Sequence, residues 1–465
     1  MPVIFITDAF IFLLVLMVVA YVLYARRHEH LRAPWHNVAC RPLAMSAAII
    51  LAVYVVVGLL DSVHFHPKLE ATKINDTVYS TEVLSLLDLV LEDLHENTER
   101  TYSAPLASYA FSKEMIDLPD GKQIRDYPRL KYGGAHLDAP VTERVPDIVK
   151  RLFVGLLCGL VISLFLSSLI IILLSRAHKV SFKQALHKLF KNDYYVAWTA
   201  MIITVSLIII VGSCVYNLSQ YYHVFGTDKV GQDVLYQAIK SIRTGLVIGT
   251  LTTLVMLPFA IMMGLMAGYF RGWIDDVIQY LYTTLNSIPG VLLIAASILL
   301  LQVYIGNHAD DFNSIEERAD LRLLFLCIIL GITSWTGLCR LLRAETLKLR
   351  EIDYVQAAQA FGVSNLSIML RHLLPNVMHI VMISIVIDFS GLVLAEAVLS
   401  YINIGVDPSM NSWGNMINGA RLEMAREPIV WWSLAAAFVF MFVLVLAANL
   451  FSDAVRDAFD PRLRH

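Results

Sequence analysis

"EIDYVQAAQAFGVSNLSIMLRHLLPN" (351–376) is a polar, alanine-rich stretch between two long apolar segments. Over 352–361 its apolar residues recur on one face of a helix and its polar residues on another. Gly362 is expected to end this helix, Ser364 to cap a second one, and Pro375 to start the next apolar segment. The pattern predicts a surface helix tied at both ends to membrane helices. An interfacial helix that only covers the bilayer has the same periodicity, so both interpretations stay open.

The composition of the whole chain is that of a membrane protein with many spans. Of its 465 residues, 57% are hydrophobic and 16% are charged, and the mean hydropathy is +0.63. Soluble domains carry about 25% charged residues. The net charge of −3 gives no basic field, so no nucleic-acid partner is expected. Nine segments are apolar enough to cross a bilayer: 3–25, 42–61, 150–175, 194–216, 240–268, 275–303, 321–344, 375–400 and 428–451.

The distribution of lysine and arginine predicts the orientation of these spans. The short loop 26–41 holds four arginines and the loop 176–193 one arginine and four lysines, whereas 217–239 and 304–320 hold one such residue each. Loops rich in lysine and arginine stay in the cytoplasm. We therefore expect the N-terminus outside and the C-terminus in the cytoplasm.

The segment 62–147 is too long for a simple connection between two spans. Over 80–102 its leucines and valines recur at helical spacing, and acidic residues that include Asp88 and Glu99 lie mostly opposite, which predicts one amphipathic helix. Residues 117–140 are rich in Pro, Gly and Asp and predict turns with a short hairpin. Together they predict a small extracytoplasmic cap.

The opening stretch resembles the coupling segment of ABC importer permeases, whose pattern combines Glu-Ala-Ala, a glycine and a closing Leu-Pro. The matching residues are Ala357, Ala358, Gly362, Leu374 and Pro375, while Gln356 stands in place of the glutamate. Four further segments are similar to the dipeptide, oligopeptide and nickel permease family: 225–249, 334–358, 394–417 and 453–462. The chain is thus identified as a member of that family, of the dipeptide permease C type, with an N-terminal extension.

The resemblance implies an all-α polytopic protein of the bacterial inner (plasma) membrane. Residues 192–465 would form the six-helix core of a type I ABC importer permease, with a coupling helix at about 351–372. Before this core, 1–61 would supply two extra spans, 62–147 the cap, and 148–191 a third extra helix with a basic cytoplasmic loop. The family pattern does not account for this extension.

The energy source is expected to lie outside the chain. No GxxxxGK[ST] loop occurs, so the chain is expected to bind no cofactor and to leave ATP hydrolysis to other subunits. The resemblance implies a second homologous permease, two ATP-binding subunits that hold ATP and Mg, an extracytoplasmic solute-binding protein and surrounding membrane lipid. Contact with the ATPase is expected at Asp353, Tyr354, Gln356, Ala357, Ala358, Gly362, Leu374 and Pro375.

Polar groups within the spans are candidates for the transport pathway, because a charge in lipid costs about 2.5–3.5 kcal/mol or more. Asp388 would face the pathway or contact the partner permease, and Glu396 would line the pathway or form a packing hydrogen bond. Asn286 and Pro289 belong to "NSIPG", which predicts a bend in the sixth span, with a ligand contact as the alternative.

The resemblance also places four residues near a docked solute-binding protein: Asp228, Gly231, Asp233 and Trp413. A turn and a helix start explain the two aspartates equally well. The histidine pairs of "HEH" (28–30) and "HFH" (64–66) are interpreted as loop residues and not as metal ligands, because alternate spacing without further ligands is weak evidence.

The leading functional hypothesis is a permease for di- or oligopeptides. A permease for nickel or another small solute of the same family is the alternative within transport, and a non-transporting membrane sensor or scaffold is the alternative outside it. The retained Gly362 and Leu-Pro speak against a scaffold. The cap is expected to cover the outer mouth or to assist docking of the binding protein.

Overall fold

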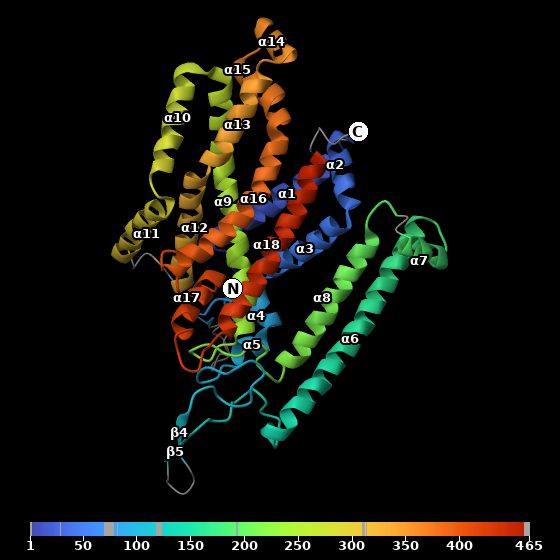
Figure 1. The fold of residues 1–465 in the computed structure, drawn as a ribbon, viewed down its shortest axis with the longest axis vertical. Coiled ribbons are helices and arrows are strands. Elements are labelled where there is room, and N and C mark those ends of the chain that lie inside the picture. The colour runs from blue at the N-terminus through green and yellow to red at the C-terminus, as the bar shows by residue number, and fades with distance from the viewer. Residues whose placement is uncertain are drawn as a thin grey trace. The chain divides into compact units, whose positions relative to one another are not determined.

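The computed structural model describes residues 2–27, 29–68, 79–80, 82–117, 123–191, 194–308, 312 and 314–459. Within these ranges, nine helices are long and apolar enough to cross a membrane, which confirms the predicted number of spans (Figure 1). Contacts group the chain into two compact units. Unit 1 comprises Met1–Pro2, His36–Arg243 and Asn411–Ala447, and unit 2 comprises Val3–Trp35, Thr244–Met410 and Ala448–His465.

Unit 2 is helical and contains the opening stretch. Its helices are α1 (Ile6–Arg27), α10 (Gly272–Ser287), α11 (Gly290–Asn307), α12 (Ile315–Ser334), α13 (Thr336–Leu349), α14 (Asp353–Ala360), α15 (Asn365–Ile368) and α16 (Leu374–Tyr401), with a π-helical stretch, η2 (Met369–Leu373), between the last two. Three helices contribute to both units: α2 (Glu29–Ala39), α9 (Val234–Phe270) and α18 (Trp432–Phe459).

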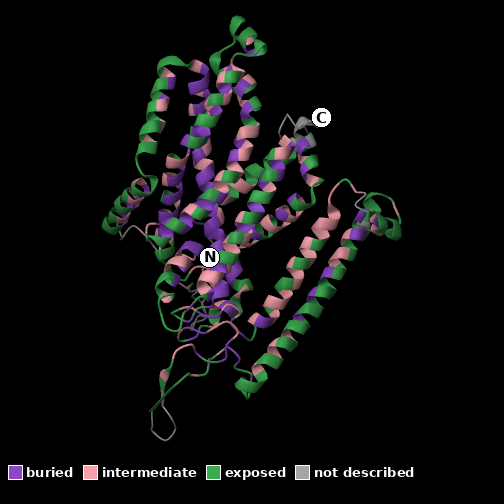
Figure 2. Ribbon diagram, viewed as in Figure 1, coloured by how far each residue is buried: buried purple, intermediate pink, exposed green. Residues whose placement is uncertain are grey.

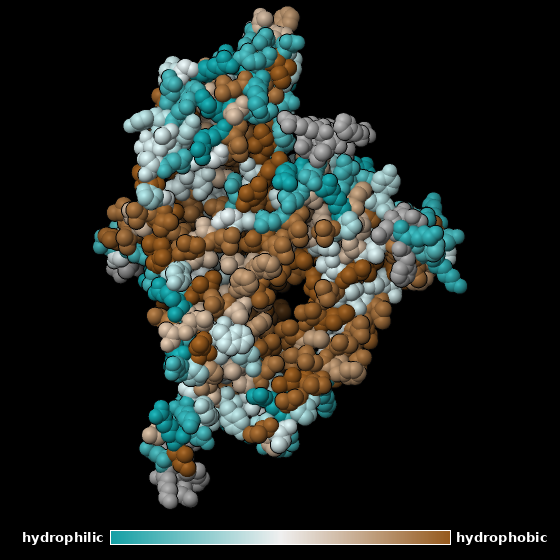
Figure 3. All heavy atoms as spheres, in the orientation of Figure 1, coloured by the Kyte–Doolittle hydropathy of each residue, from teal (hydrophilic) through white to brown (hydrophobic). Residues whose placement is uncertain are grey.

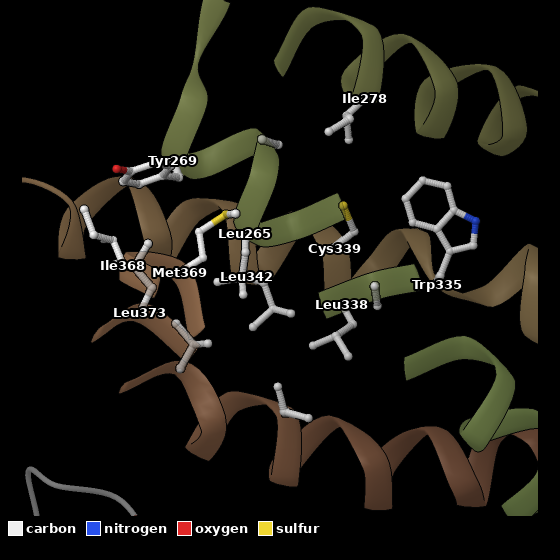
Figure 4. Packing of buried hydrophobic residues seen from close by; sticks show 14 of the residues in the cluster. Leu265, Tyr269, Ile278, Trp335, Leu338, Cys339, Leu342, Ile368, Met369 and Leu373 are labelled. Atoms are coloured by element: carbon white, nitrogen blue, oxygen red, sulfur yellow. The ribbon is translucent and has the colours of Figure 1, made fainter. Parts of the chain in front are cut away.

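Helix α9 lies at the centre of the unit 2 core. It supplies residues to one buried cluster with α13, α14 and α16, and to another with α11, α12 and α16. Figure 4 shows Leu265, Leu342 and Met369 of the first cluster pointing toward one another. A Cβ on Gly264 would lie 2.7 Å from the Cβ of Leu342, so the glycine is what allows α13 to pack this closely.

The sixth predicted span, 275–303, is wrong as a single helix. The structure has two helices there, α10 and α11, which meet at Ile288 in an extended conformation, with Pro289 as the N-cap of α11. Of these two helices, α11 is long and apolar enough to cross a membrane and α10 is not. The bend predicted at "NSIPG" is confirmed and is sharp enough to end the helix, because proline cannot continue the preceding hydrogen-bond ladder.

Helix α1 packs within unit 2, against α12. The Thr7 backbone N–H donates to Asp320 at 3.1 Å, and the Thr7 hydroxyl donates to the same carboxylate. Ile11 packs against the cluster that α12 shares with α9. The first of the extra helices is therefore built into the same unit as the family-like helices, and the contact units differ from the predicted division at 192.

Unit 1 combines a group of helices with the described part of segment 62–147, the predicted cap, which is called the cap below. The helices are α3 (Pro42–Asp61), α6 (Pro140–Ala177), α7 (Phe182–Phe190), α8 (Trp198–Ser219) and α17 (Trp413–Glu423), and the cap holds β2 (His64–Phe65), β3 (Leu84–Ser85), α4 (Leu86–Val90), α5 (Glu92–Glu96), β4 (Glu114–Asp117) and β5 (Gln123–Asp126). A further two-residue strand, β1 (Pro2–Val3), begins the described chain.

Helices α6 and α8 lie side by side, and their backbones are in close contact. A Cβ on Gly155 would lie 2.8 Å from the Cα of Cys214, and one on Gly159 would lie 2.8 Å from the Cα of Ile210. The Ser213 hydroxyl donates to the Gly155 carbonyl at 2.9 Å. Small residues four positions apart and a hydroxyl across the interface are the usual means of joining helices in lipid.

The cap confirms one local prediction and corrects another. β4 and β5 pair as an antiparallel hairpin, as the turn-rich residues 117–140 predict, although 118–122 lie outside the described residues. The single amphipathic helix predicted over 80–102 is wrong. The chain there forms two five-residue helices, α4 and α5. Leu91 separates them, because its backbone dihedral angles, φ −107° and ψ 25°, are not helical.

Two acidic residues assigned to the exposed face are in fact buried, and the first of them pairs with a lysine. The Nζ of Lys240 lies 2.8 Å from Oδ1 of Asp88 and 3.0 Å from Oδ1 of Asp61. The Tyr236 hydroxyl donates to Asp88 at 2.7 Å, and the Ser85 hydroxyl donates to Asp61 at the same distance. Because a buried carboxylate needs such partners, α4 is held against the start of α9.

The second buried acid, Glu99, organises the other side of the cap. It accepts hydrogen bonds from the backbone N–H groups of Lys131, Tyr132 and Gly133 at 2.8, 2.8 and 3.1 Å. Nε2 of His223 lies 3.4 Å from Glu99, within ion-pair range, and Nδ1 of the same ring is hydrogen-bonded to Asp233 at 2.7 Å. Glu99 thereby connects three parts of unit 1 that are distant in sequence.

These contacts set the protonation of the cluster. Burial alone would raise the pKa of Glu99, but His223 and the three backbone N–H groups outweigh it and hold the pKa at about 2. Burial alone would lower the pKa of His223, but the two carboxylates outweigh it and raise the pKa to about 9. At neutral pH the histidine is therefore charged between two anions.

The cluster predicts a pH dependence of the stability of unit 1. The contribution of charged His223 to the free energy of unfolding is complete below about pH 6.5, the ordinary pKa of histidine. It is lost as the pH rises through about 9, the pKa in the folded protein. The contribution of Glu99 is complete above about pH 4.5 and is lost as the pH falls toward 2. The thermal midpoint is expected to be highest between these limits. Circular dichroism melts of the His223→Gln variant should lack the alkaline decline; a decline equal to that of the wild type would contradict this assignment.

Candidate functional site

The opening stretch forms an exposed elbow between α13 and α16. Helix α14 lies beyond the ends of both helices (Figure 1), and most of its residues are exposed (Figure 2). Its first residue is Asp353, and Ile352 precedes it as an N-cap without a side-chain hydrogen bond. The predicted surface helix is thus present and spans Asp353–Ala360, shorter than the 351–372 expected.

A single buried side chain anchors α14. Val355 is fully buried in the cluster that includes Leu342, Ile368 and Leu373. Ala358 packs against the same cluster, whereas the other residues of α14 are exposed. A helix this short has little stability of its own, so its position depends on the Val355 contact.

Gly362 turns the chain between α14 and α15. Its φ of +74° is a conformation that residues with a side chain rarely adopt. The Val363 N–H donates to the Ala358 carbonyl at 3.1 Å, and the Gly362 N–H donates to that of Gln359 at 3.0 Å, which closes the end of α14. The predicted helix break is confirmed. Ser364 is the N-cap of α15, although its side chain makes no capping hydrogen bond.

The second half of the elbow continues directly into a span. Residues Asn365–Tyr401 form one helical run, in which the π-helical turns of η2 join α15 to α16. Leu374 begins α16 and Pro375 lies in its first turn, where the missing N–H leaves no bond unmade. Motion of the elbow is therefore connected to a membrane helix without an intervening loop.

Polar contacts connect the elbow to the C-terminal end of α9. The Tyr269 hydroxyl donates to Oδ1 of Asn365 at 2.9 Å, and Arg350 donates to the Tyr269 carbonyl at 2.7 Å. Arg271 lies 2.6 Å from Glu351 in an exposed ion pair. The elbow thus contacts the end of α9 both from its second half, through Asn365, and from the residue before it, Arg350.

Contacts within the elbow involve two of the residues predicted from the sequence. Asn376 donates to the Tyr354 hydroxyl at 3.0 Å and to the His372 carbonyl at 2.6 Å. Gln356 donates to the Glu351 carbonyl at 3.3 Å. The side-chain amide of Gln356 therefore makes a local hydrogen bond, although the residue is exposed.

Exposed apolar side chains cover the elbow, and we call them the elbow surface. They are Ile352, Tyr354, Phe361, Val363, Leu366 and Leu370. Phe361 is 86% exposed and Leu366 is 62% exposed. The gathering of these exposed apolar side chains on one segment favours a partner surface.

A bidentate ion pair holds α10 against α13 next to the elbow. Nε and Nη2 of Arg343 each lie 2.6 Å from a carboxylate oxygen of Asp275. Thr336 at the other end of α13 donates to Asn286 at 3.1 Å, so Asn286 makes a helix contact. Sequence reasoning missed Asp275, Arg343 and the glycine spacing of "GLMAG" (264–268), which is visible in the sequence as a close-packing motif.

The two acidic residues of α16 differ in their surroundings. Glu396 is buried and accepts a hydrogen bond from Ser400 at 2.7 Å, as the packing interpretation expects. Asp388 is half-buried and makes no hydrogen bond or ion pair with any described residue of the chain. A role of Asp388 in the pathway or in contact with a partner permease stays a prediction.

The four residues predicted for binding-protein docking lie in unit 1. Asp228 accepts from the N–H groups of Val230 and Gln232, both at 2.9 Å, and so shapes a turn. Asp233 is buried, and its Oδ1 accepts from the Leu235 N–H at 2.8 Å at the start of α9. These contacts favour the turn and helix-start interpretation for the aspartates.

The remaining two docking candidates are also buried. Gly231 has a φ of +80°, and a Cβ there would lie 1.9 Å from the Glu99 carbonyl oxygen. Trp413 donates from its indole N–H to the Ala238 carbonyl at 3.0 Å. Docking through these residues stays a prediction, and their observed contacts are internal to unit 1.

The predicted loop histidines contribute no cluster in the described part of the chain. The side chains of 28–30 lie outside the described residues. His64 is buried, and Nδ1 of His66 lies 3.2 Å from the Glu82 carbonyl oxygen. Among the described residues, no group of three His, Cys, Asp or Glu side chains has the arrangement of a metal site.

Comparison with known proteins matches the second half of the chain. Residues 260–465 match the family model described as "Binding-protein-dependent transport system inner membrane component". This range contains the elbow, α16, the Asp275–Arg343 pair and the glycine motif of α9.

Similar sequences come from several bacteria. The dipeptide transport system permease protein DppC of Lactococcus lactis is 31% identical over 240 residues, which are 52% of this chain and 64% of that protein. The glutathione transport system permease protein GsiD of Pectobacterium atrosepticum is 30% identical over 244 residues, 52% of this chain and 73% of that protein. The oligopeptide transport system permease protein OppC of Mycobacterium tuberculosis is 30% identical over 242 residues, 52% of this chain and 77% of that protein.

Among solved structures, an inward-facing form of the MetNI methionine ABC transporter matches 47% of this chain and 96% of that chain, with 14% identity and a TM-score of 0.35. The sequence matches extend over most of the length of GsiD and OppC at 30% identity. The family model, which matches 260–465, includes the helices that carry the elbow. This chain belongs to the family of binding-protein-dependent transport system inner membrane components, as a multi-pass membrane permease with an N-terminal extension.

Proposed function

We propose that the chain is the transmembrane permease subunit of an ATP-driven importer of di- or oligopeptides. A separate ATPase moves it through the elbow, 351–376. The observation that carries this proposal is the construction of the elbow: Val355 fixes α14 to the helix bundle, while Phe361 and its apolar neighbours remain exposed for a partner.

The contacts of the elbow support transmission of movement. A partner that binds the elbow surface pushes on α14, which is joined to α13 on one side and to the continuous run Asn365–Tyr401 on the other. The Tyr269–Asn365 hydrogen bond adds a path to α9. An ATPase with different contacts before and after ATP hydrolysis can shift the equilibrium between two arrangements of these helices.

The choice of peptide as the solute is supported by the relatives. They are named for dipeptide, glutathione and oligopeptide transport, all of which carry peptide or peptide-like solutes. The complete importer is proposed to contain a second homologous permease, two ATPase subunits that hold ATP and Mg, and an extracytoplasmic solute-binding protein. In this arrangement the N-terminus lies outside and the C-terminus in the cytoplasm.

The test compares two substitutions of Gly362. Valine is strained at a φ of +74° by about 1–2 kcal/mol, whereas asparagine adopts this conformation readily. Nothing lies within 4 Å of a Cβ at this position, so neither substitution creates a clash. In proteoliposomes with the partner subunits, Gly362→Val is expected to lower ATP-dependent tripeptide uptake by about tenfold, while Gly362→Asn retains it.

Two outcomes would contradict the proposal. If Gly362→Val transported at the wild-type rate, the elbow would not be the coupling element. If Ni²⁺ uptake responded to ATP and peptide uptake did not, the peptide assignment would be wrong although the coupling role would stand. Thermal midpoints of both variants serve as the folding control.

A further inference from the structure

The connection between α6 and α8 is strongly basic, and its only acidic residue in the sequence is Asp193, near its end. No Asp or Glu occurs between Asp147 and Asp193. Five cations follow the apolar part of α6: Arg176, Lys179, Lys183, Lys188 and Lys191. All five are exposed, and the structure shows no ion pair between any of them and another described residue. The positive-inside rule accounts for basic residues in such a connection, and the structure adds where their side chains lie.

Helix α7 is held in a fixed position by its apolar face. Ala185 and Leu189 are buried against Ile171 and Leu174 of α6, and Trp198 of α8 packs on the same cluster. The Thr199 hydroxyl donates to the Leu189 carbonyl at 2.8 Å. Ser181 and Gln184 form a capping box at the start of the helix. The opposite, polar face of α7 is consequently presented outward.

That polar face, with one residue on either side of α7, lines an open surface hollow of about 640 Å³. Its lining consists of Val180, Lys183, Gln184, His187, Lys188 and Lys191. None of these side chains is acidic, and three carry a fixed positive charge. The hollow therefore suits an anion larger than a simple ion, with an amide and an imidazole available as further hydrogen-bond groups.

The neighbouring surface of α6 is apolar and exposed. Leu169, Ile172 and Leu173 are 43%, 40% and 56% exposed. Figure 3 shows hydrophilic colour over α7 at the end of this helix pair and hydrophobic colour along the pair itself. A ligand that satisfies both surfaces has an anionic head and a hydrocarbon tail.

We propose that the polar face of α7 binds the phosphate headgroup of an anionic phospholipid, with the acyl chains along α6. Lysine clusters beside membrane helices attract such headgroups. This site lies in the extension, outside the range that matches the family model, and it does not depend on the proposed transport activity.

The experiment uses the purified full-length protein in nanodiscs. Thermal midpoints are measured in phosphatidylcholine alone and with increasing phosphatidylglycerol, up to about a quarter of the lipid. Co-purifying lipid is quantified by native mass spectrometry. The test variant is Lys183→Gln/Lys188→Gln. The matched control is Arg26→Gln/Arg32→Gln, which removes the same charge from two exposed residues of another basic segment.

Wild type and the control are expected to retain phosphatidylglycerol and to be stabilised by it. The Lys183/Lys188 variant should bind it about 25-fold more weakly, at about fivefold for each lysine. Equal lipid retention by the two double variants would overturn the proposal. Stabilisation of the wild type by inorganic phosphate in phosphatidylcholine nanodiscs, to the same degree as by phosphatidylglycerol, would show a free-phosphate site and would also overturn it. A single Lys191→Gln variant gives the same comparison if the double variant folds poorly.

Discussion

Replacement of Val355 by aspartate is expected to abolish coupling, with ATP-dependent uptake lowered by a hundredfold or more. Val355 is the one fully buried residue of α14 and lies among Leu342, Ile368 and Leu373. An unpaired carboxylate there costs several kcal/mol, which is more than the packing of so short a helix can offset. The aspartate therefore leaves the cluster and takes α14 with it. Uptake and ATPase activity in proteoliposomes measure the result.

The matched control is Gln359→Asp. It introduces the same charge on the same helix at an exposed position. This variant is expected to retain most of the uptake. Equal losses in both variants would mean that charge on α14, and not the Val355 anchor, governs coupling. Retained uptake in Val355→Asp would show that α14 need not be fixed to the bundle.

Replacement of Lys240 by methionine is expected to destabilise unit 1 by about 3–5 kcal/mol. The substitution leaves Asp61 and Asp88 buried without their cation, although Tyr236 and Ser85 still donate to them. Two neighbouring carboxylates without a cation repel each other, so one must be protonated or α4 must detach. Thermal unfolding and the rate of proteolysis within the cap measure the loss.

A compensating variant isolates the cause of this loss. Combining Lys240→Met with Asp61→Asn and Asp88→Asn removes the uncompensated charges and keeps similar shapes. It is expected to recover much of the stability lost in the single variant. If the combined variant were no more stable than Lys240→Met alone, the loss would come from packing of the lysine side chain and the ion-pair explanation would fail.

Local features of the sequence predicted those parts of the fold that depend on local physics. Hydropathy located nine spans because each needs its own run of apolar residues. The turn at Gly362 was predictable because a helix followed by glycine commonly ends there with a positive φ. The β4–β5 hairpin followed from turn residues between short polar strands.

The parts that were wrong depend on contacts between residues distant in sequence. Helical periodicity assigns Asp88 and Glu99 to the solvent side, and nothing near them in sequence reveals that Lys240 and His223 will pair with them. The same applies to Thr7 and Asp320, which place α1 against α12. The role of Val355 as the anchor of α14 was likewise not predictable, since the buried cluster that it joins includes residues of α9, α10 and α13, which are distant in sequence.

The glycine motifs are an intermediate case. "GLLCG" (155–159) and "GLMAG" (264–268) are readable as close-packing motifs, but the sequence does not name the helix that each one meets. The structure supplies α8 for the first and α13 for the second.

Because Asn365–Tyr401 is one continuous helical run that begins in the elbow, a small tilt at the elbow becomes a large displacement at the far end of the run. Its 37 residues extend roughly 55 Å at 1.5 Å per residue. A tilt of only about 5° about one end displaces the other by about 5 Å, close to the rise of one helical turn. The π-helical turns of η2 are the region of this run where the α-helical ladder is interrupted, so bending under load is concentrated within one turn of Ile368, next to the buried contact of Val355.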